Sequence, residues 1–145
     1  MANYIQKGNT IDYINTGNAK INAGDVVVIG TRIGVAGCDI AVGAVGAVAL
    51  TGVFEFDKAS GAIAVGQGVY WDAENKQITT TASGNAPAGF CIAAVQSGDA
   101  TVRVCLTEAR QAANCAKAAG TAPTKAEFDA VIDALVAAGL MAAAE

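Results

Sequence analysis

The 145-residue sequence predicts a mainly β fold: a small β-barrel or jelly-roll-like sandwich followed by one C-terminal α-helix. Short apolar runs alternate with turn residues at a spacing of roughly 8–12 residues, which is typical of sandwiches and barrels. The composition agrees, because 53% of the residues are hydrophobic, only 6% are aromatic, and 17 glycines are available for tight turns. No stretch before Leu106 has helical periodicity, whereas the region after Thr107 does.

One turn-and-strand pattern recurs three times in the β region. Gly supplies the backbone freedom for the turn, Asp can bond its own backbone beyond it, and a short β-branched run follows. The copies are AGDVVVIG (Ala23–Gly30), VGQGVYWD (Val65–Asp72) and SGDATVRV (Ser97–Val104). Alternation in TVRVCL predicts a half-buried strand in which Val102, Val104 and Leu106 share one face.

Further strands are expected between these copies. The candidates are Ile11–Ile14, Ile33–Ala36, Ala47–Phe56, Gln77–Thr81 and Phe90–Val95. The segment WDAENKQITT reads as a hairpin in which AENK forms the turn. We therefore expect one β domain over residues 1–107.

The chain changes character after this domain. Residues 108–123 are Ala-rich and predict a linker or a helix, and residues 124–145 predict an amphipathic helix. Thr124 and Glu127 form a capping box, and Gly139 is placed to cap the other end. One apolar face is expected from the helical spacing of Phe128, Val131, Ile132, Leu135 and Val136. Because a lone helix of about four turns is marginal in water, this face needs a partner, either the β domain or another copy.

Charge and hydropathy exclude several classes of partner. The net charge is −4, and the nine Lys and Arg residues are scattered singly, so the clustered positive surface of a nucleic-acid-binding protein is missing. The apolar stretch between Asp39 and Glu55 is shorter than the roughly 20 residues that span a bilayer. The opening MANYIQKGNT has no apolar signal-peptide core. We expect a soluble protein made in a cytoplasm, without a membrane or nucleic-acid partner.

The sequence also offers little catalytic chemistry. It contains no histidine, which excludes His-based triads and His-ligated metal sites. The cysteines form no CxxC motif, and Cys91 and Cys105 are expected to be small buried residues of strands. Carboxylates are isolated and mostly sit beside turn glycines, and no phosphate-binding GxxxxGK[ST] loop occurs. We expect no enzyme activity, no cofactor and no metal.

One lysine offers an alternative function. The strand VFEF runs into DKAS and then into a second apolar run, which resembles the hairpin that carries the modified lysine of lipoyl or biotinyl carrier domains. Lys58 would then be the modified residue. Against this, the chain from Asp25 to Asp57 is longer than a carrier domain places between its Gly-Asp turn and its lysine. The other interpretation is an ordinary hairpin turn with Lys58 and Ser60 exposed for solubility.

The order of five sequence blocks resembles one known family. The blocks are ANYIQKGNTIDYINTG, AGDVVVIGTRIGVA, GAVGAVALTGVFEFDKASG, GQGVYWDAENKQITTTASGNAPAGF and SGDATVRVCL. From about Ala2 to Leu106 the chain resembles the phage capsid cement, or decoration, proteins, which are sometimes mislabelled as recombinase-related.

The resemblance implies a β-barrel or jelly-roll domain that binds the outside of a phage head. It implies a structural virion protein, made in the bacterial host cytoplasm, that works as a dimer or trimer and bridges subunits of the major capsid protein. A cement protein needs a rigid core and a contact surface rather than catalytic groups. Because aromatic and apolar residues are enriched at interfaces, we expect capsid or oligomer contacts at Tyr4, Ile5, Phe54, Phe56, Tyr70, Trp71, Phe128, Val131 and Leu135.

Overall fold

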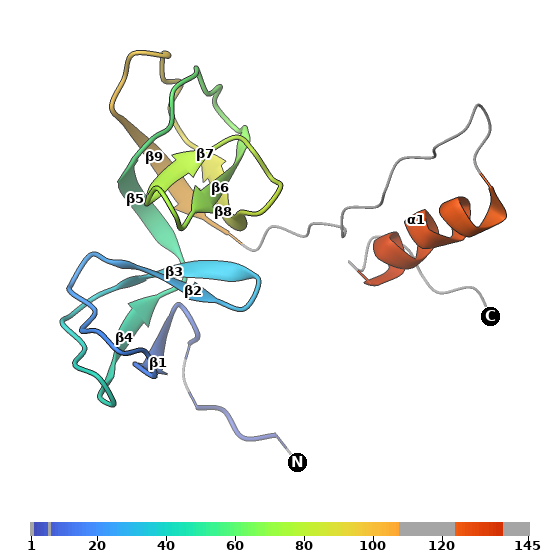
Figure 1. Ribbon diagram of the computed structural model, residues 1–145. Coiled ribbons are helices and arrows are strands. Elements are labelled where there is room, and N and C mark those ends of the chain that lie inside the picture. Colours follow the sequence, from blue (N-terminus) through green and yellow to red (C-terminus); the bar gives the residue numbers. More distant parts are fainter. Residues whose placement is uncertain (1, 6, 108–123, 138–145) are drawn as a thin grey trace. The chain divides into compact units, whose positions relative to one another are not determined.

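The computed structural model describes residues 2–5, 7–107 and 124–137 (Figure 1). The chain divides into two compact units, Met1–Ala109 and Arg110–Glu145. The described part of the first unit is built from strands, and that of the second from one helix. The predicted mainly β fold with a C-terminal helix is therefore confirmed.

The first sheet contains four antiparallel strands in the order β1-β4-β3-β2. The strands are β1 (Thr10–Ile14), β2 (Val26–Ile29), β3 (Arg32–Ala36) and β4 (Val45–Ala49). A two-residue turn joins β2 to β3, and its first residue, Gly30, has a φ of 60°, which glycine adopts at little cost. Ile14 of β1 lies opposite Val45 of β4, and these strands run antiparallel as far as Thr10 and Ala49.

The second sheet contains five antiparallel strands in the order β5-β9-β8-β6-β7. The strands are β5 (Gly52–Asp57), β6 (Gly68–Asp72), β7 (Gln77–Thr79), β8 (Ala86–Cys91) and β9 (Thr101–Leu106). The sheet curls until its two edges meet at one point, where Lys58 forms an isolated parallel bridge with Ile78. A single bridge does not make a ladder, so the sheet is not closed into a barrel, and the sandwich is the alternative that the structure adopts.

The two sheets share one connectivity. β1, β2, β3 and β4 correspond in order to β5, β6, β8 and β9, and β7 is added beside β6. We call residues 9–51 the first half and residues 52–107 the second half. Each half also contains one isolated antiparallel bridge in the same place, Ile21 with Ile40 and Ile63 with Val95.

Backbone hydrogen bonds recur at corresponding positions of the two halves. The Gly24 amide donates to the Ala36 carbonyl at 2.8 Å, and the Gly66 amide donates to the Cys91 carbonyl at 2.7 Å. The recurring turn pattern in the sequence is therefore one part of a larger repeated unit. The turn from Ala41 to Ala44 has the same backbone bond as the three predicted copies, and so does the turn from Ala82 to Asn85.

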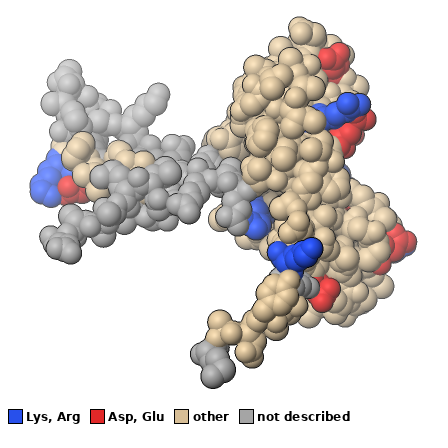
Figure 2. Space-filling view, turned by 180° about the vertical axis from the view of Figure 1, so that it is seen from behind, with Lys and Arg blue, Asp and Glu red and all other residues tan. Residues whose placement is uncertain are grey.

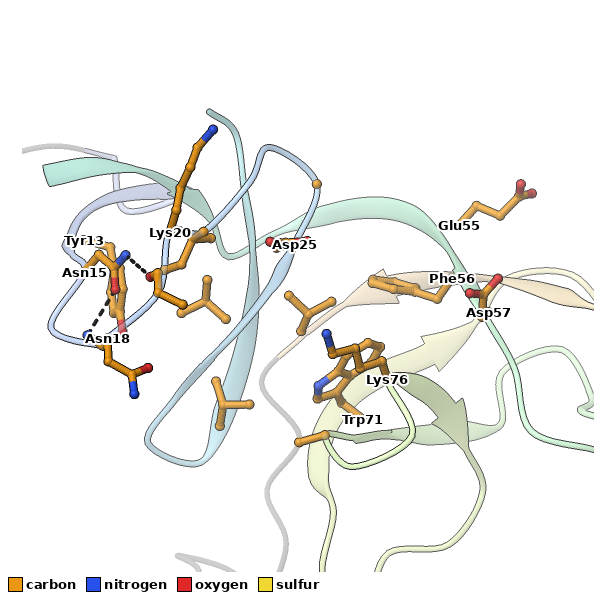
Figure 3. Close-up of a pocket in the computed structure, with 18 of the residues that line it drawn as sticks. Tyr13, Asn15, Asn18, Lys20, Asp25, Glu55, Phe56, Asp57, Trp71 and Lys76 are labelled. Carbon is orange, nitrogen blue, oxygen red and sulfur yellow. Dashed lines mark hydrogen bonds between the residues drawn. The ribbon is translucent and has the colours of Figure 1, made fainter. Parts of the chain in front are cut away.

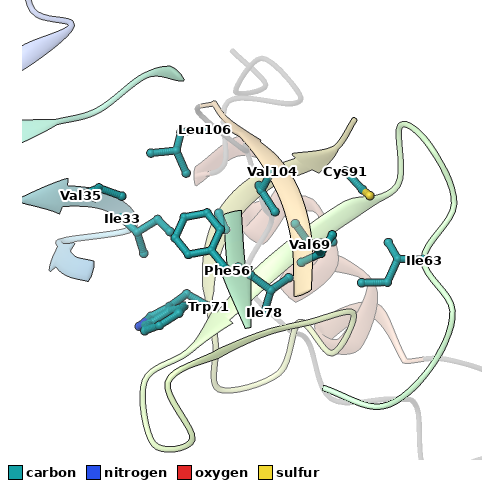
Figure 4. Packing of buried hydrophobic residues seen from close by; sticks show 12 residues of the cluster. Ile33, Val35, Phe56, Ile63, Val69, Trp71, Ile78, Cys91, Val104 and Leu106 are labelled. Carbon is teal, nitrogen blue, oxygen red and sulfur yellow. The ribbon is translucent and has the colours of Figure 1, made fainter. Parts of the chain in front are cut away.

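The larger hydrophobic core belongs mainly to the second half (Figure 4). Its buried members are Ile33, Val35, Phe56, Ile63, Val69, Trp71, Ile78, Ala88, Cys91, Val102, Val104 and Leu106. Ile33 and Val35 come from β3, so this core is also where the two sheets pack together. The predicted inward face of Val102, Val104 and Leu106 is confirmed, because all three side chains are buried.

A smaller core lies on the opposite face of the first sheet. It buries Val27, Ala36, Ile40 and Val48, with Ile21 and Tyr13 packed against them at partial exposure. Successive residues of a strand point to opposite faces, so Val35 and Ala36 of β3 belong to different cores.

Two corresponding glycines allow the strands to approach closely. A Cβ atom on Gly34 would lie 3.0 Å from the Ala49 carbonyl oxygen, and one on Gly89 would lie 2.0 Å from the Cys105 carbonyl oxygen. Gly89 has a φ of 139°, outside the range of other residues, and adjoins the β-bulge between β6 and β8.

Three sequence-predicted strands differ from the observed ones. Ala47–Phe56 is divided into β4 and β5, because the chain crosses from one sheet to the other at Gly52, whose φ is 123°. The predicted strand Phe90–Val95 begins and ends too far along the sequence, since β8 runs from Ala86 to Cys91. Gln77–Thr81 is shortened to the three residues of β7. In each case long-range pairing decides where the strand ends.

The second unit contains α1 (Lys125–Ala137). The Phe128 amide donates to the Thr124 carbonyl at 3.0 Å, and Lys125 forms an i,i+4 ion pair with Asp129. The capping glutamate side chain, the Gly139 cap and the 108–123 linker lie outside the described residues. α1 falls short of the length and apolar character that crossing a membrane requires.

Candidate interaction surfaces

Lys58 is not exposed at a turn. Its side chain is 8% exposed, and its ammonium group donates to the carbonyls of Ala59 at 3.1 Å and Ser97 at 3.4 Å. The Lys58 amide donates to the Ala100 carbonyl, which extends the pairing of β5 with β9. A carrier lysine must reach a modifying enzyme and then swing between active sites, so this geometry disfavours the carrier hypothesis. It also contradicts the interpretation of Lys58 as a solvent-exposed turn residue, whereas Ser60 is exposed as that interpretation expects.

The burial of Lys58 in the second half is matched by the burial of Asn15 in the first half. Among the described residues, these two are the buried side chains with polar or charged groups, and they occupy corresponding positions of the two halves. The Asn15 amide donates to the Ala44 carbonyl just as the Lys58 amide donates to that of Ala100. The Asn15 side chain donates to the Ala19 and Ile40 carbonyls and accepts from the Gly17 amide. Each side chain therefore ties the end of its half's first strand to neighbouring loops.

Two carboxylates have lowered pKa values because of the hydrogen bonds that they accept. The hydrogen bond from Lys20, at 2.6 Å, and the Ala23 amide hold the pKa of Asp39 below its ordinary value. The Asn75 side chain and amide do the same to the pKa of Asp72 in the β6–β7 hairpin. The bonds to Asp72 lie within one hairpin, and those to Asp39 join its loop to the segment that carries Lys20 and Ala23, so both carboxylates have a structural explanation.

The described residues contain no cluster of three or more His, Cys, Asp or Glu side chains that could hold a metal ion. Cys38, Cys91 and Cys105 are free thiols. Cys91 is buried, as the sequence predicts, and its thiol donates to the Ala93 carbonyl at 2.8 Å. Cys105 is half-buried, and Cys115 lies outside the described residues.

A cleft of about 790 Å³ lies between the two halves (Figure 3). One wall comes from the end of β1, the loop after it and β2, and the other from the end of β5 and the β6–β7 hairpin. Val26 and Val28 contribute apolar surface to the first wall, and Phe56 and Trp71 to the second. The volume falls in the range of roughly 300–1,000 Å³ that is typical of ligand sites.

The charged residues around this cleft are more acidic than basic. Asp25, Glu55 and Asp57 line it together with Lys20 and Lys76, which leaves one net negative charge. Figure 2 shows small separate groups of acidic and basic residues, some of them side by side, with uncharged residues between the groups.

A second surface feature is a group of three exposed apolar residues in the first half, Ile14, Val42 and Val45. Ile14 and Val45 face each other across β1 and β4 and are 54% and 60% exposed. Val42, also exposed, lies in the turn that precedes β4. We call these three residues the valine–isoleucine cluster.

The corresponding positions of the second half are polar. Asp57 faces Thr101 across β5 and β9, in the place that Ile14 and Val45 occupy in the first half. Ser97 stands in the turn before β9, in the place of Val42. The same backbone therefore carries solvent-compatible residues in one half and exposed hydrophobic residues in the other.

A family model described as phage cement protein matches residues 5–106, which cover both sheets. The chain belongs to the phage cement protein family. Searches of curated proteins and of solved structures found no significant match to this cement protein. Membership identifies a structural, virion-associated protein that binds capsid components, and it agrees with the resemblance predicted from the five sequence blocks.

The structure distributes the expected contact residues of the cement protein among different environments. Tyr4 and Ile5 are 80% and 82% exposed. Phe54 and Tyr70 are half-buried, as is Leu135 of α1, whereas Phe128 and Val131 are exposed. Phe56 and Trp71 belong to the core, with ring centroids 6.1 Å apart, so they line the cleft with little exposed area.

Sequence reasoning missed the exposed aliphatic residues of the first sheet. Val28, Ile14 and Val45 look like ordinary strand residues, and period-two alternation places them on the face that also carries the buried Ile33 and Val35. The second sheet covers that face only in part, through β3 and β8. A comparison of corresponding positions in the repeated halves could have found Ile14 and Val45, because Asp57 and Thr101 stand there in the second half.

Proposed function

We propose that this cement protein binds the outer surface of a phage head and stabilises the capsid by bridging subunits of the major capsid protein. The exposure of the valine–isoleucine cluster is the observation that supports a contact site there. Exposed neighbouring hydrophobic residues on a soluble protein mark interaction sites, and the polar residues in the second half show that the fold does not need them there.

Two sheets packed around one core suit a bridging role. The internal pressure of packaged DNA pulls neighbouring capsid subunits apart, and a bridge resists this only if it is itself rigid. The described residues of the β domain are tied by antiparallel pairing in both sheets and by the core that joins them. Apolar contacts to the capsid would release water from the cluster and contribute roughly 25 cal/mol for each Å² buried.

Peptide mass spectrometry of gradient-purified phage particles tests the assignment to the virion. The expected result is tens to hundreds of copies of this chain per particle, counted against the major capsid protein. Its absence from intact particles, with abundant protein in the soluble lysate, would contradict the proposal. Cryo-electron microscopy of the same particles would then show whether density for the β domain lies on the outer surface between capsid subunits.

Variants of the cluster test the contact site itself. The double change Ile14→Asp with Val45→Thr copies the polar pair of the second half, so the fold is expected to tolerate it. Binding to particles that lack the protein should fall by at least about tenfold, since an apolar contact is lost and a carboxylate must be desolvated. Val65→Thr is the matched control, because Val65 is an equally exposed valine in a turn of the second half. If the double variant and the control bind the particles equally well, the capsid contact lies elsewhere on the protein.

The apolar residues of α1 form a second proposed contact, either with another copy or with the capsid. Phe128 and Val131 are exposed, and Leu135 is half-buried. Removal of residues 124–145 is expected to change the oligomeric state or to weaken particle binding. If the shortened chain keeps both, the helix serves neither purpose.

A further inference from the structure

The outer edge of β2 lacks the strand that covers its counterpart. In the second half, β7 pairs with β6 through Tyr70–Thr79, Trp71–Ile78 and Asp72–Gln77. In the first half, β2 corresponds to β6 but ends the sheet, because the two-residue turn from Ile29 to Arg32 leaves no chain for an added strand.

The backbone of β2 is oriented to accept such a strand. The Ala36 amide donates to the Asp25 carbonyl at 2.9 Å, so Asp25 is bonded toward β3. Bonding alternates along an antiparallel pair, which directs the amides and carbonyls of Val26 and Val28 away from β3. No other strand in the described ranges pairs with this edge. Free edges of this kind pair readily with extended segments of other chains.

The cleft between the halves lies along this edge. Val26, Val27 and Val28 line it consecutively, and Phe56 and Trp71, labelled in Figure 3, line it from the second half. A segment paired with β2 would therefore place one side chain between Val28 and Trp71, much as Ile78 of β7 is buried in the second half. The site combines main-chain bonding with an apolar contact.

The segment before β1, residues 2–8, has the properties of the missing strand. The chain is attached to the first sheet from Asn9 onward, where the Leu50 amide donates to the Asn9 carbonyl at 2.8 Å. Before that point the described residues form no strand, and Tyr4 and Ile5 are the most exposed large hydrophobic side chains described. Residues 2–8 carry Lys7 and no acid, which complements the net negative cleft.

We infer that residues 2–8 of one copy add as a strand to β2 in the cleft of a second copy. Tyr4 or Ile5 fills the space between Val28 and Trp71, and Lys7 approaches the carboxylates of Asp25 and Asp57. A reciprocal exchange produces a dimer, and a cyclic one produces a trimer. The exchange links copies to each other and does not depend on the capsid contact proposed above.

Sedimentation velocity and native mass spectrometry of four proteins test this exchange. The proteins are the native chain, a chain without residues 2–8, and the full-length variants Val28→Pro and Val53→Pro. Val28→Pro removes an amide on the outward side of β2 while leaving the bonds to β3. Val53→Pro is the matched control: Val53 is an exposed valine of the edge strand β5, and it does not line the cleft. The native chain and Val53→Pro should be oligomers, whereas Val28→Pro and a chain without residues 2–8 should be monomers.

Hydrogen exchange measures the protection of β2 in proteins that keep the native β2 sequence, so this test does not depend on the folding of Val28→Pro. The Val26 and Val28 amides should exchange slowly in the native chain and quickly in the chain without residues 2–8. A synthetic peptide of residues 2–9 should restore slow exchange. The inference is overturned by a native chain that is monomeric at every dilution, by an oligomer that survives loss of residues 2–8, or by equal dissociation of both proline variants. A monomer whose own segment protects β2 also overturns it.

Discussion

The two halves of the β domain have the same connectivity but contribute differently to the hydrophobic core and to the exposed apolar surface. The second half contributes ten of the twelve residues of the larger core, whereas the first half buries four residues in a core of its own. Corresponding surface positions are polar in the second half and apolar in the first, as Thr101 and Val45 show. The second half is therefore expected to dominate stability, and the first half to dominate contacts.

The first prediction compares the two crowded glycines and has the largest expected effect. Gly89→Ala should lower the free energy of unfolding by roughly 3 kcal/mol or more, because it combines an unsuitable φ with a clash against backbone. Gly34→Ala should cost about 1–3 kcal/mol, since its nearest contact, at 2.5 Å, is the Val48 side chain rather than backbone. Urea denaturation measures both. Equal losses of unfolding free energy in the two variants would contradict a closer approach of the strands at Gly89 than at Gly34.

The second prediction compares two fully buried isoleucines, one from each core. Ile78→Ala and Ile40→Ala each fall in the range of roughly 2–5 kcal/mol for removing a large aliphatic side chain. Ile78→Ala should be the more costly, because Ile78 belongs to a strand and packs in the larger core, whereas Ile40 lies in a loop and packs in the smaller core. Denaturation gives the global loss, and hydrogen exchange should show that Ile40→Ala opens mainly the first half. A larger loss for Ile40→Ala would reverse the proposed order of stability.

The third prediction compares the two corresponding buried polar residues. Asn15→Ala removes three side-chain hydrogen bonds of 2.8–3.0 Å, and Lys58→Ala removes two of 3.1 and 3.4 Å. Each should cost about 1–3 kcal/mol in unfolding free energy, with Asn15→Ala the larger. Intact mass spectrometry of the native chain provides a separate check, because an acyl or biotinyl group on Lys58 would add mass. Such an adduct would revive the carrier hypothesis.

The fourth prediction concerns acid and has the smallest expected effect. The folded-state pKa values of Asp39 and Asp72 lie below the ordinary value of 3.8, so their contribution to stability is present above that pH and is lost as the pH falls through the folded values. Thermal unfolding of Asp39→Asn and Asp72→Asn should differ from the native chain at pH 6 and converge with it in acid. Both carboxylates are exposed, so the differences should be small. A difference in unfolding temperature that grows in acid would contradict the hydrogen bonds assigned to these two carboxylates.

Much of the β domain could be predicted from local patterns. Period-two alternation correctly placed Val102, Val104 and Leu106 on one buried face, and turn chemistry located the β6–β7 hairpin. The strand from Ala47 to Phe56 was not divided correctly, because nothing local distinguishes a strand that changes sheets from one that continues. Lys58 was placed at an exposed turn for a related reason: its burial depends on Ser97, which is distant in the sequence.

The sequence by itself determined the fold class, the absence of histidine chemistry and the likeness to cement proteins, since these follow from composition, periodicity and the order of local blocks. Only the tertiary structure decided which hydrophobic residues are available for contacts. Val35 and Val45 lie on the same face of the first sheet, yet Val45 is 60% exposed and Val35 only 6%. Burial depends on which distant segments cover a face, and a sheet that is covered over only part of its length leaves the rest of its apolar face to a partner.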